Sequence, residues 1–140
     1  MAFTWKKSFE LGHPLIDAQH KQLVDTFNDL MDACLSGEGR DKLESTLDFL
    51  CEYTIKHFND EEEWQCSINY PEYQNHRQIH EDFKELVTKL MAEFKKGGPT
   101  DIVVAELNCA VGEWLVNHIK MDDAKIASFY LQEKYGRGQD

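Results

Sequence analysis

Apolar residues recur at alternating steps of three and four positions along four long segments, and this periodicity restricts the fold more than any other feature of the chain. The segments span residues 16–34, 43–64, 73–94 and 104–118. Steps of three and four place side chains on one face of an α-helix, whereas a half-buried strand would alternate at every second residue. The spacing therefore predicts four long amphipathic helices.

Short breaks separate these segments, at residues 36–39, 66–71 and 97–99. Connections of this length favour antiparallel neighbours, so we expect an all-α, up-down-up-down four-helix bundle. Asp17 is expected to cap the first helix, and Thr100 or Asp101 the fourth. A further short helix is expected from about Asp123 to Tyr135.

Length and charge limit the classes of protein and partner. The 140 residues suit one domain, 1–140, that can bury a core of its own. The 26 acidic and 15 basic residues leave a net charge of −11, which repels phosphate backbones and anionic lipids. Neither an apolar leader nor a stretch of about 18 apolar residues is present. We therefore expect a cytoplasmic protein without a membrane span or a nucleic-acid partner.

The four cysteines, Cys34, Cys51, Cys66 and Cys109, are far apart and form no CxxC pair. This spacing does not indicate a zinc knuckle or a thioredoxin-like site. We expect all four to be small, buried apolar residues.

Polar side chains occupy several positions of the apolar face, where burial is costly unless it is compensated. They are His20, His57, Glu61, His76, His80 and His118. In an antiparallel bundle, the starts of the first and third helices meet the ends of the second and fourth. The topology therefore brings these six side chains to one end of the molecule.

Spacing within the helices indicates what the cluster could hold. His57 and Glu61 are four residues apart, as are His76 and His80, so each pair projects from one helix face. Imidazole and carboxylate ligands suit iron, zinc, manganese or copper, and the absence of a thiolate makes non-haem iron the first choice. We therefore predict a metal cluster rather than an unmetallated polar core.

Four motifs carry a resemblance to a known family. The segments IDAQHKQL (16–23), HFNDEE (57–62), HRQIH (76–80) and WLVNHIKMDD (114–123) resemble the hemerythrin signature in order and spacing. The likeness extends over residues 5–130, and it implies that Trp5 packs an N-terminal arm on the bundle.

The resemblance also implies a set of metal ligands. His76, His80 and His118 would hold one iron ion, and His20 and His57 the other. Glu61, Asp123 and an oxo or hydroxo group would bridge the two ions, which pass between Fe²⁺ and Fe³⁺.

One bridging position is ambiguous. Helical register from His118 favours Asp122, four residues on, whereas the family pattern HIxxxD points to Asp123, five residues on. We assign Asp123, because the bridge is expected where the fourth helix ends and ideal register no longer applies.

These ligands fill all but one position of two six-coordinate ions, and the open position lies on the ion with two histidines. The resemblance implies that O₂ binds there reversibly, for storage, delivery or supply to an oxidase. It implies no catalytic residues, although low-level oxidase or peroxidase activity is compatible with such a site. The positions that match the family's oxygen pocket are Leu23, Phe58, Leu115 and Ile119.

Three other functions stay open at this stage: a di-iron enzyme acting on peroxide or nitric oxide, an oxygen or redox sensor, and an iron buffer. Glu10 and His13 form an ExxH pair, but ferritin-like proteins need two such pairs on helices. We expect His13 to lie at the surface or to support the ligands from behind. Glu62 and Glu63 are expected to lie outside the cluster.

Overall fold

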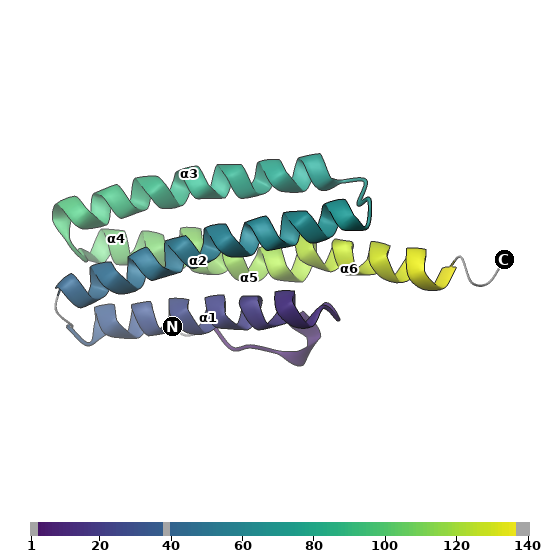
Figure 1. Cartoon of the computed structure of the whole chain (residues 1–140). Coiled ribbons are helices and arrows are strands. Elements are labelled where there is room, and N and C mark those ends of the chain that lie inside the picture. The colour runs from purple at the N-terminus through teal and green to yellow at the C-terminus, as the bar shows by residue number, and fades with distance from the viewer. Residues whose placement is uncertain (1–2, 38–39, 137–140) are drawn as a thin grey trace.

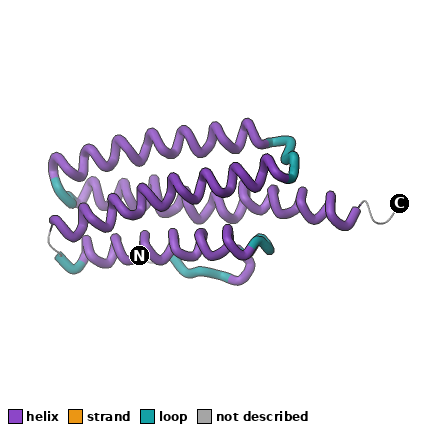
Figure 2. Tube along the Cα trace, in the orientation of Figure 1, coloured by secondary structure: helices purple, strands orange, loops and turns teal. Residues whose placement is uncertain are grey.

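The computed structural model describes residues 3–37 and 40–136, and this part of the chain forms helices and no strands. A short 3₁₀ helix, η1 (Lys7–Phe9), precedes three long helices: α1 (Pro14–Leu35), α2 (Arg40–Ser67) and α3 (Tyr73–Gly97). Figure 1 shows them lying side by side with a fourth helical rod, and Figure 2 shows loops only at the connections and in the arm before α1. The predicted all-α bundle is confirmed.

The fourth rod is built from consecutive helical pieces without a break between them. They are α4 (Asp101–Glu106), η2 (Leu107–Glu113), α5 (Trp114–His118), η3 (Ile119–Asp123), α6 (Ala124–Leu131) and η4 (Gln132–Gly136). The η2, η3 and η4 segments are π-helical, with wider turns than an α-helix. The expected C-terminal helix is thus present as a direct continuation of the fourth helix (Figure 1).

The start of α1 differs from the prediction. His13 is the N-cap, and its Nδ1 accepts a hydrogen bond from the backbone N–H of Ile16 at 3.3 Å. The Asp17 carboxylate instead accepts from the backbone N–H groups of Leu11 at 2.7 Å and Gly12 at 3.1 Å. Asp17 was predicted as the cap because acidic residues favour helix starts, but it fastens the preceding arm to α1.

The start of α4 follows the prediction. Thr100 is its N-cap, and the hydroxyl accepts from the backbone N–H of Val103 at 3.2 Å. The preceding helix, α3, ends at Gly97, and its C-cap residue, Gly98, has a φ of 76°. This left-handed conformation is one that glycine adopts without a side-chain clash.

The N-terminal arm packs on the bundle as expected. The ring of Trp5 meets that of Phe9 edge-on at 5.5 Å, and both contact the main apolar core. Asn28 of α1 holds the arm with two hydrogen bonds to the backbone of Phe3, at 2.8 and 2.7 Å.

Two apolar clusters lie at different levels of the bundle. The larger includes Phe27, Leu30, Leu47, Phe94 and Leu107. The smaller consists of Ile16, Trp64, Tyr70 and Ile126. No helix within residues 3–37 and 40–136 is both long enough and apolar enough to cross a membrane.

The cysteines differ from the expectation of uniform burial. Cys34 and Cys51 are partly buried, whereas Cys66 and Cys109 are exposed, and all four are free thiols. The prediction was therefore wrong for Cys66 and Cys109, which lie on the outer faces of their helices.

Candidate metal centre

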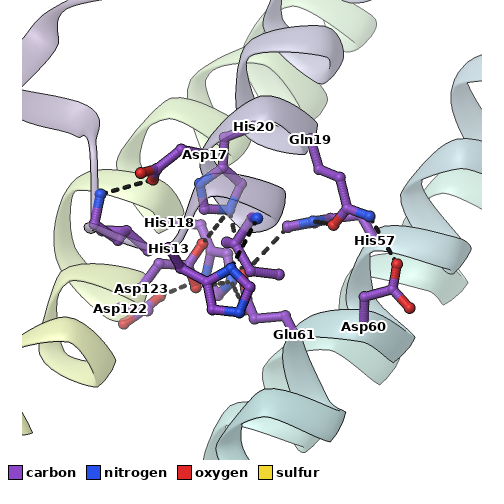
Figure 3. Close-up of polar contacts among 12 residues, drawn as sticks. His13, Asp17, Gln19, His20, His57, Asp60, Glu61, His118, Asp122 and Asp123 are labelled. Atoms are coloured by element: carbon purple, nitrogen blue, oxygen red, sulfur yellow. Dashed lines mark hydrogen bonds and ion pairs between the residues drawn. The ribbon is translucent and has the colours of Figure 1, made fainter. Parts of the chain in front are cut away.

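Seven ionisable side chains from all four helical rods meet between the two apolar clusters. They are His20 (α1), His57 and Glu61 (α2), His76 and His80 (α3), His118 (α5) and Asp123 (η3). Each is at most 3% exposed. Figure 3 shows several of them converging from different helices. The structure thus brings together every residue predicted as a ligand.

Glu61 divides its two oxygens between two groups of histidines. Its Oε1 lies 2.8 Å from Nε2 of His76 and 3.2 Å from Nε2 of His80. Its Oε2 lies 3.2 Å from Nε2 of both His20 and His57. One carboxylate therefore faces both sides of the cluster.

Asp123 divides its oxygens in the same way. Its Oδ1 lies 3.0 Å from Nε2 of His76 and 3.1 Å from Nε2 of His118, while Oδ2 lies 3.0 Å from Nε2 of His20. Two adjacent sets of donor atoms result, one with three imidazoles and one with two, and they share both carboxylates. This arrangement can hold two cations side by side.

The π-helical turn η3 determines which aspartate faces the cluster. In a π-helix the residue five positions on lies about one turn away, instead of the residue four positions on. Asp123 therefore faces Nε2 of His118, while Asp122 turns outward and its Oδ2 lies 2.8 Å from Nδ1 of the same ring. The helix does not end at this point, so the reason given above for choosing Asp123 was wrong.

The electrostatics of the cluster favour positive charge at its centre. Burial by itself would lower the pKa of His118, but two neighbouring aspartate carboxylates outweigh it and raise this pKa to about 10. Burial likewise opposes charge on His20 and His76, yet Asp123 and Glu61 raise both pKa values to about 9. In the opposite sense, burial would raise the pKa of Glu61, but the surrounding imidazoles lower it well below its ordinary value.

The outward-facing histidine nitrogens show that the cluster suits metal ions. Three rings have an acceptor at Nδ1: His57 has Gln19 Oε1 at 2.8 Å, His80 has Glu62 Oε2 at 2.9 Å, and His118 has Asp122 Oδ2 at 2.8 Å. With the proton on Nδ1, each ring directs the lone pair of Nε2 inward. Cations at the centre would satisfy these lone pairs.

Two further features of the cluster also indicate that it suits metal ions. The Nε2 atoms of His80 and His118 lie only 3.0 Å apart, so either one of them carries a proton or a cation lies between the two rings. Both buried oxygens of Asp123 lack a hydrogen bond of good geometry within the described part of the chain. The donor set therefore fits metal ions, which would bind the nitrogens and oxygens together.

Aromatic rings enclose the cluster on the side of the main core. Phe58 stacks on His80 with ring centroids 3.8 Å apart and planes 4° from parallel. Trp114 stacks on His118 at 4.5 Å. The four residues predicted to form an oxygen pocket are all buried in this core: Leu23, Phe58, Leu115 and Ile119.

Sequence reasoning missed the residues that hold the ligand rings in place. Glu62 and Glu63 lie outside the seven-residue cluster as expected, but the contact of the Glu62 carboxylate with the outward nitrogen of His80 was not foreseen. Gln19 was not singled out, although it immediately precedes His20 in sequence and is buried. His13, expected at the surface or behind the ligands, caps α1 and meets the Trp64 ring edge-on at 4.8 Å.

A helical bundle with a buried imidazole and carboxylate cluster belongs to the class of cation-binding four-helix proteins. Residues 11–130 match the family model described as "Hemerythrin HHE cation binding domain". The chain belongs to the hemerythrin family.

Individual relatives agree with this assignment. The chain is 33% identical to a bacteriohemerythrin of Pseudomonas aeruginosa over 120 residues, which cover 86% of this chain and 76% of the relative. It is 34% identical to a myohemerythrin of Theromyzon tessulatum over 124 residues, which cover 88% of this chain and 89% of the relative. A crystal structure of a hemerythrin mutant superposes with a TM-score of 0.79 at 27% identity, covering 92% of this chain and 98% of that one.

Proposed function

We propose that this protein binds O₂ reversibly at a pair of iron ions and acts as a non-catalytic carrier. The main support for the proposal is that the five histidines are divided unequally between the two donor sets. Glu61 and Asp123 each face both donor sets, but one set has three imidazoles and the other has two. If two six-coordinate ions shared both carboxylates and a bridging oxygen, His20 and His57 would leave one position open for a small ligand.

Iron is the metal that this proposal requires. The donor atoms are imidazole nitrogens and carboxylate oxygens without a thiolate, which suits a non-haem iron centre. Iron bound here would supply the electrons that O₂ binding needs. Residues of the chain would do the rest: His76, His80 and His118 hold one ion, and His20 and His57 the other.

The apolar residues proposed to surround the open site favour reversible binding of O₂ over catalytic turnover. Leu23, Phe58, Leu115 and Ile119 are at most 5% exposed, and we assign them to the wall of the open site. They would exclude water and protons from the site, which would favour reversible release of O₂ over loss of peroxide. The alternatives, turnover of peroxide or nitric oxide, require access for water or protons, which such a wall would restrict.

Oxygen-binding cycles would test the proposal. The iron-loaded protein is reduced without air and exposed to O₂, and its visible absorption is followed while the solution is purged and recharged. We expect a band that appears with O₂ and disappears on purging over several cycles, and metal-free protein is the control. A band that never forms would refute the proposal, and one that decays within a cycle with release of peroxide would favour an enzyme.

A further inference from the structure

The two donor sets differ in what lies behind their histidine rings. On the three-histidine side, Nδ1 of His80 donates to the Glu62 carboxylate at 2.9 Å, and Nδ1 of His118 donates to the Asp122 carboxylate at 2.8 Å. On the two-histidine side, Nδ1 of His57 donates to an amide oxygen, that of Gln19. The acceptors are therefore anionic on one side and neutral on the other.

The remaining ring on the two-histidine side, His20, strengthens this difference. Its Nδ1 is buried, and no described residue forms a hydrogen bond with it. Neither histidine on this side thus has a carboxylate behind it, whereas two of the three on the other side do.

A series of contacts that begins at the protein surface fixes the orientation of the Gln19 amide. Lys56 Nζ lies 2.9 Å from Asp60 Oδ2, and the same oxygen accepts from Gln19 Nε2 at 2.7 Å. Because the amide nitrogen must donate to Asp60, the amide oxygen must face His57 (Figure 3). His57 therefore carries its proton on Nδ1, and its ring position depends on a chain of contacts that begins at an exposed lysine.

Anionic and neutral acceptors affect a metal-bound imidazole differently. A carboxylate draws the Nδ1 proton more strongly than an amide does, because hydrogen bonds to ionised acceptors are about twice as strong. This makes the imidazole a stronger electron donor to the metal. Glu62 and Asp122 keep only 13% and 33% of their side-chain surface exposed, so solvent screens their charges incompletely.

We propose that Glu62 and Asp122 are positioning residues that make the three histidines the stronger electron donors to their iron ion. Gln19 keeps the two histidines of the other site the weaker electron donors. This inference rests on the proposed iron pair. It implies that the carboxylates stabilise the ferric state of the three-histidine ion. The ion with the open position is disposed to stay ferrous until a ligand arrives.

Isosteric substitutions separate charge from geometry. Glu62→Gln and Asp122→Asn keep an acceptor oxygen behind each ring but remove the negative charge. We expect both variants to retain their iron and to show a higher midpoint potential in an optical redox titration. Glu62→Leu and Asp122→Leu, which remove the acceptor, should bind iron roughly 10–100-fold more weakly. Glu63→Gln is the matched control, because it removes the same charge from the exposed neighbour of Glu62.

A reciprocal exchange tests the neutral side. Gln19→Glu combined with Asp60→Asn moves the carboxylate from the outer position to the inner one and leaves the net charge of the pair unchanged. This double variant should lower the midpoint potential, because His57 would then donate to a carboxylate. The expected shift in midpoint potential is opposite in sign to that of Glu62→Gln, so a general loss of stability cannot produce both results.

The proposal is overturned if Glu62→Gln and Asp122→Asn leave the potential where Glu63→Gln leaves it, or if the exchange at positions 19 and 60 does not lower it. Circular dichroism checks that each variant is folded, and if one carboxylate variant fails to fold, the other decides the comparison. Failure of the oxygen-carrier function is distinguishable. It would remove the reversible band of the unaltered protein, whereas potentials and iron affinities of the variants would still be measurable.

Discussion

Two fully buried carboxylates, Glu61 and Asp123, are the side chains whose burial most needs compensation. A buried anion is costly unless it is paired with positive charge, and removing one member of such a set costs several kcal/mol. In this chain the partners are imidazoles, which can be neutral, so the compensation depends on protons or on bound cations. Ligand residues therefore affect stability as well as metal content.

Replacement of one ligand ring should show this directly. His118→Ala removes a nitrogen from the three-histidine site, and we expect the iron content of the purified protein to fall clearly below that of the unaltered chain. His13→Asn is the control, since asparagine can also cap a helix and His13 lies outside the cluster. Full iron retention by His118→Ala would contradict the ligand assignment.

Gly112 shows how closely the elements approach at a single position. A Cβ added at this residue of η2 would lie 2.7 Å from Cζ of Phe27 and 2.5 Å from Cε2 of Phe3. Gly112→Ala should therefore destabilise the protein by about 1–3 kcal/mol through overpacking, despite the better helix propensity of alanine. Chemical denaturation would measure the difference. Gly97→Ala, where a Cβ meets nothing within 4 Å, should leave stability unchanged or slightly higher.

At the scale of elements, the π-helical turn η3 lets one short stretch of the fourth helix serve two purposes. Asp123 faces the inner nitrogen of His118, and Asp122 faces the outer nitrogen of the same ring. An ordinary α-helical turn would direct the residue four positions on towards the cluster. The wider turn thus assigns adjacent aspartates to opposite sides of one imidazole.

This assignment predicts unequal effects of two similar substitutions. Asp123→Asn removes the charge shared by both donor sets, and we expect it to reduce the bound iron severely. Asp122→Asn keeps an acceptor behind His118, and this variant should retain the bound iron. Metal analysis after gel filtration compares the two, and equal losses would show that η3 does not separate their roles.

On the scale of the whole molecule, a polar layer crosses the bundle between two apolar clusters. Metal ions that bind this layer bind only the folded state, because the donors come from all four helical rods. Such binding adds to the free energy of unfolding by mass action.

Metal removal should consequently lower the melting temperature. At a free metal concentration of 100 times Kd, binding stabilises the fold by about 2.7 kcal/mol, which corresponds to a loss of several degrees on chelation. Calorimetry before and after chelation measures it, with readdition of Fe²⁺ as the positive control. Mg²⁺ prefers oxygen ligands and should not restore stability. An unchanged melting temperature would argue against a bound metal.

The metal-free chain should also respond to pH in a defined direction. The folded-state pKa values of His20 and His76 are about 9, and that of His118 is about 10, all above the ordinary value of 6.5. Groups with raised pKa values stabilise the fold fully below pH 6.5, and this contribution is lost as pH rises through 9–10. Denaturation at pH 6.5 and pH 10 should show lower stability at the higher pH.

Iron affinity should rise between pH 5 and pH 7, because the ligand nitrogens must lose their protons before they bind the metal.

The sequence by itself determined the four helices and the meeting of five histidines with Glu61, because both follow from the helical period and from short connections. It could not determine how the π-helical turn selects Asp123, since helix register depends on packing against the rest of the bundle. It also missed Gln19 and Glu62, whose partners lie on other helices. Only the tertiary structure places these acceptors behind particular rings, because a hydrogen bond between helices depends on how the helices are rotated and staggered.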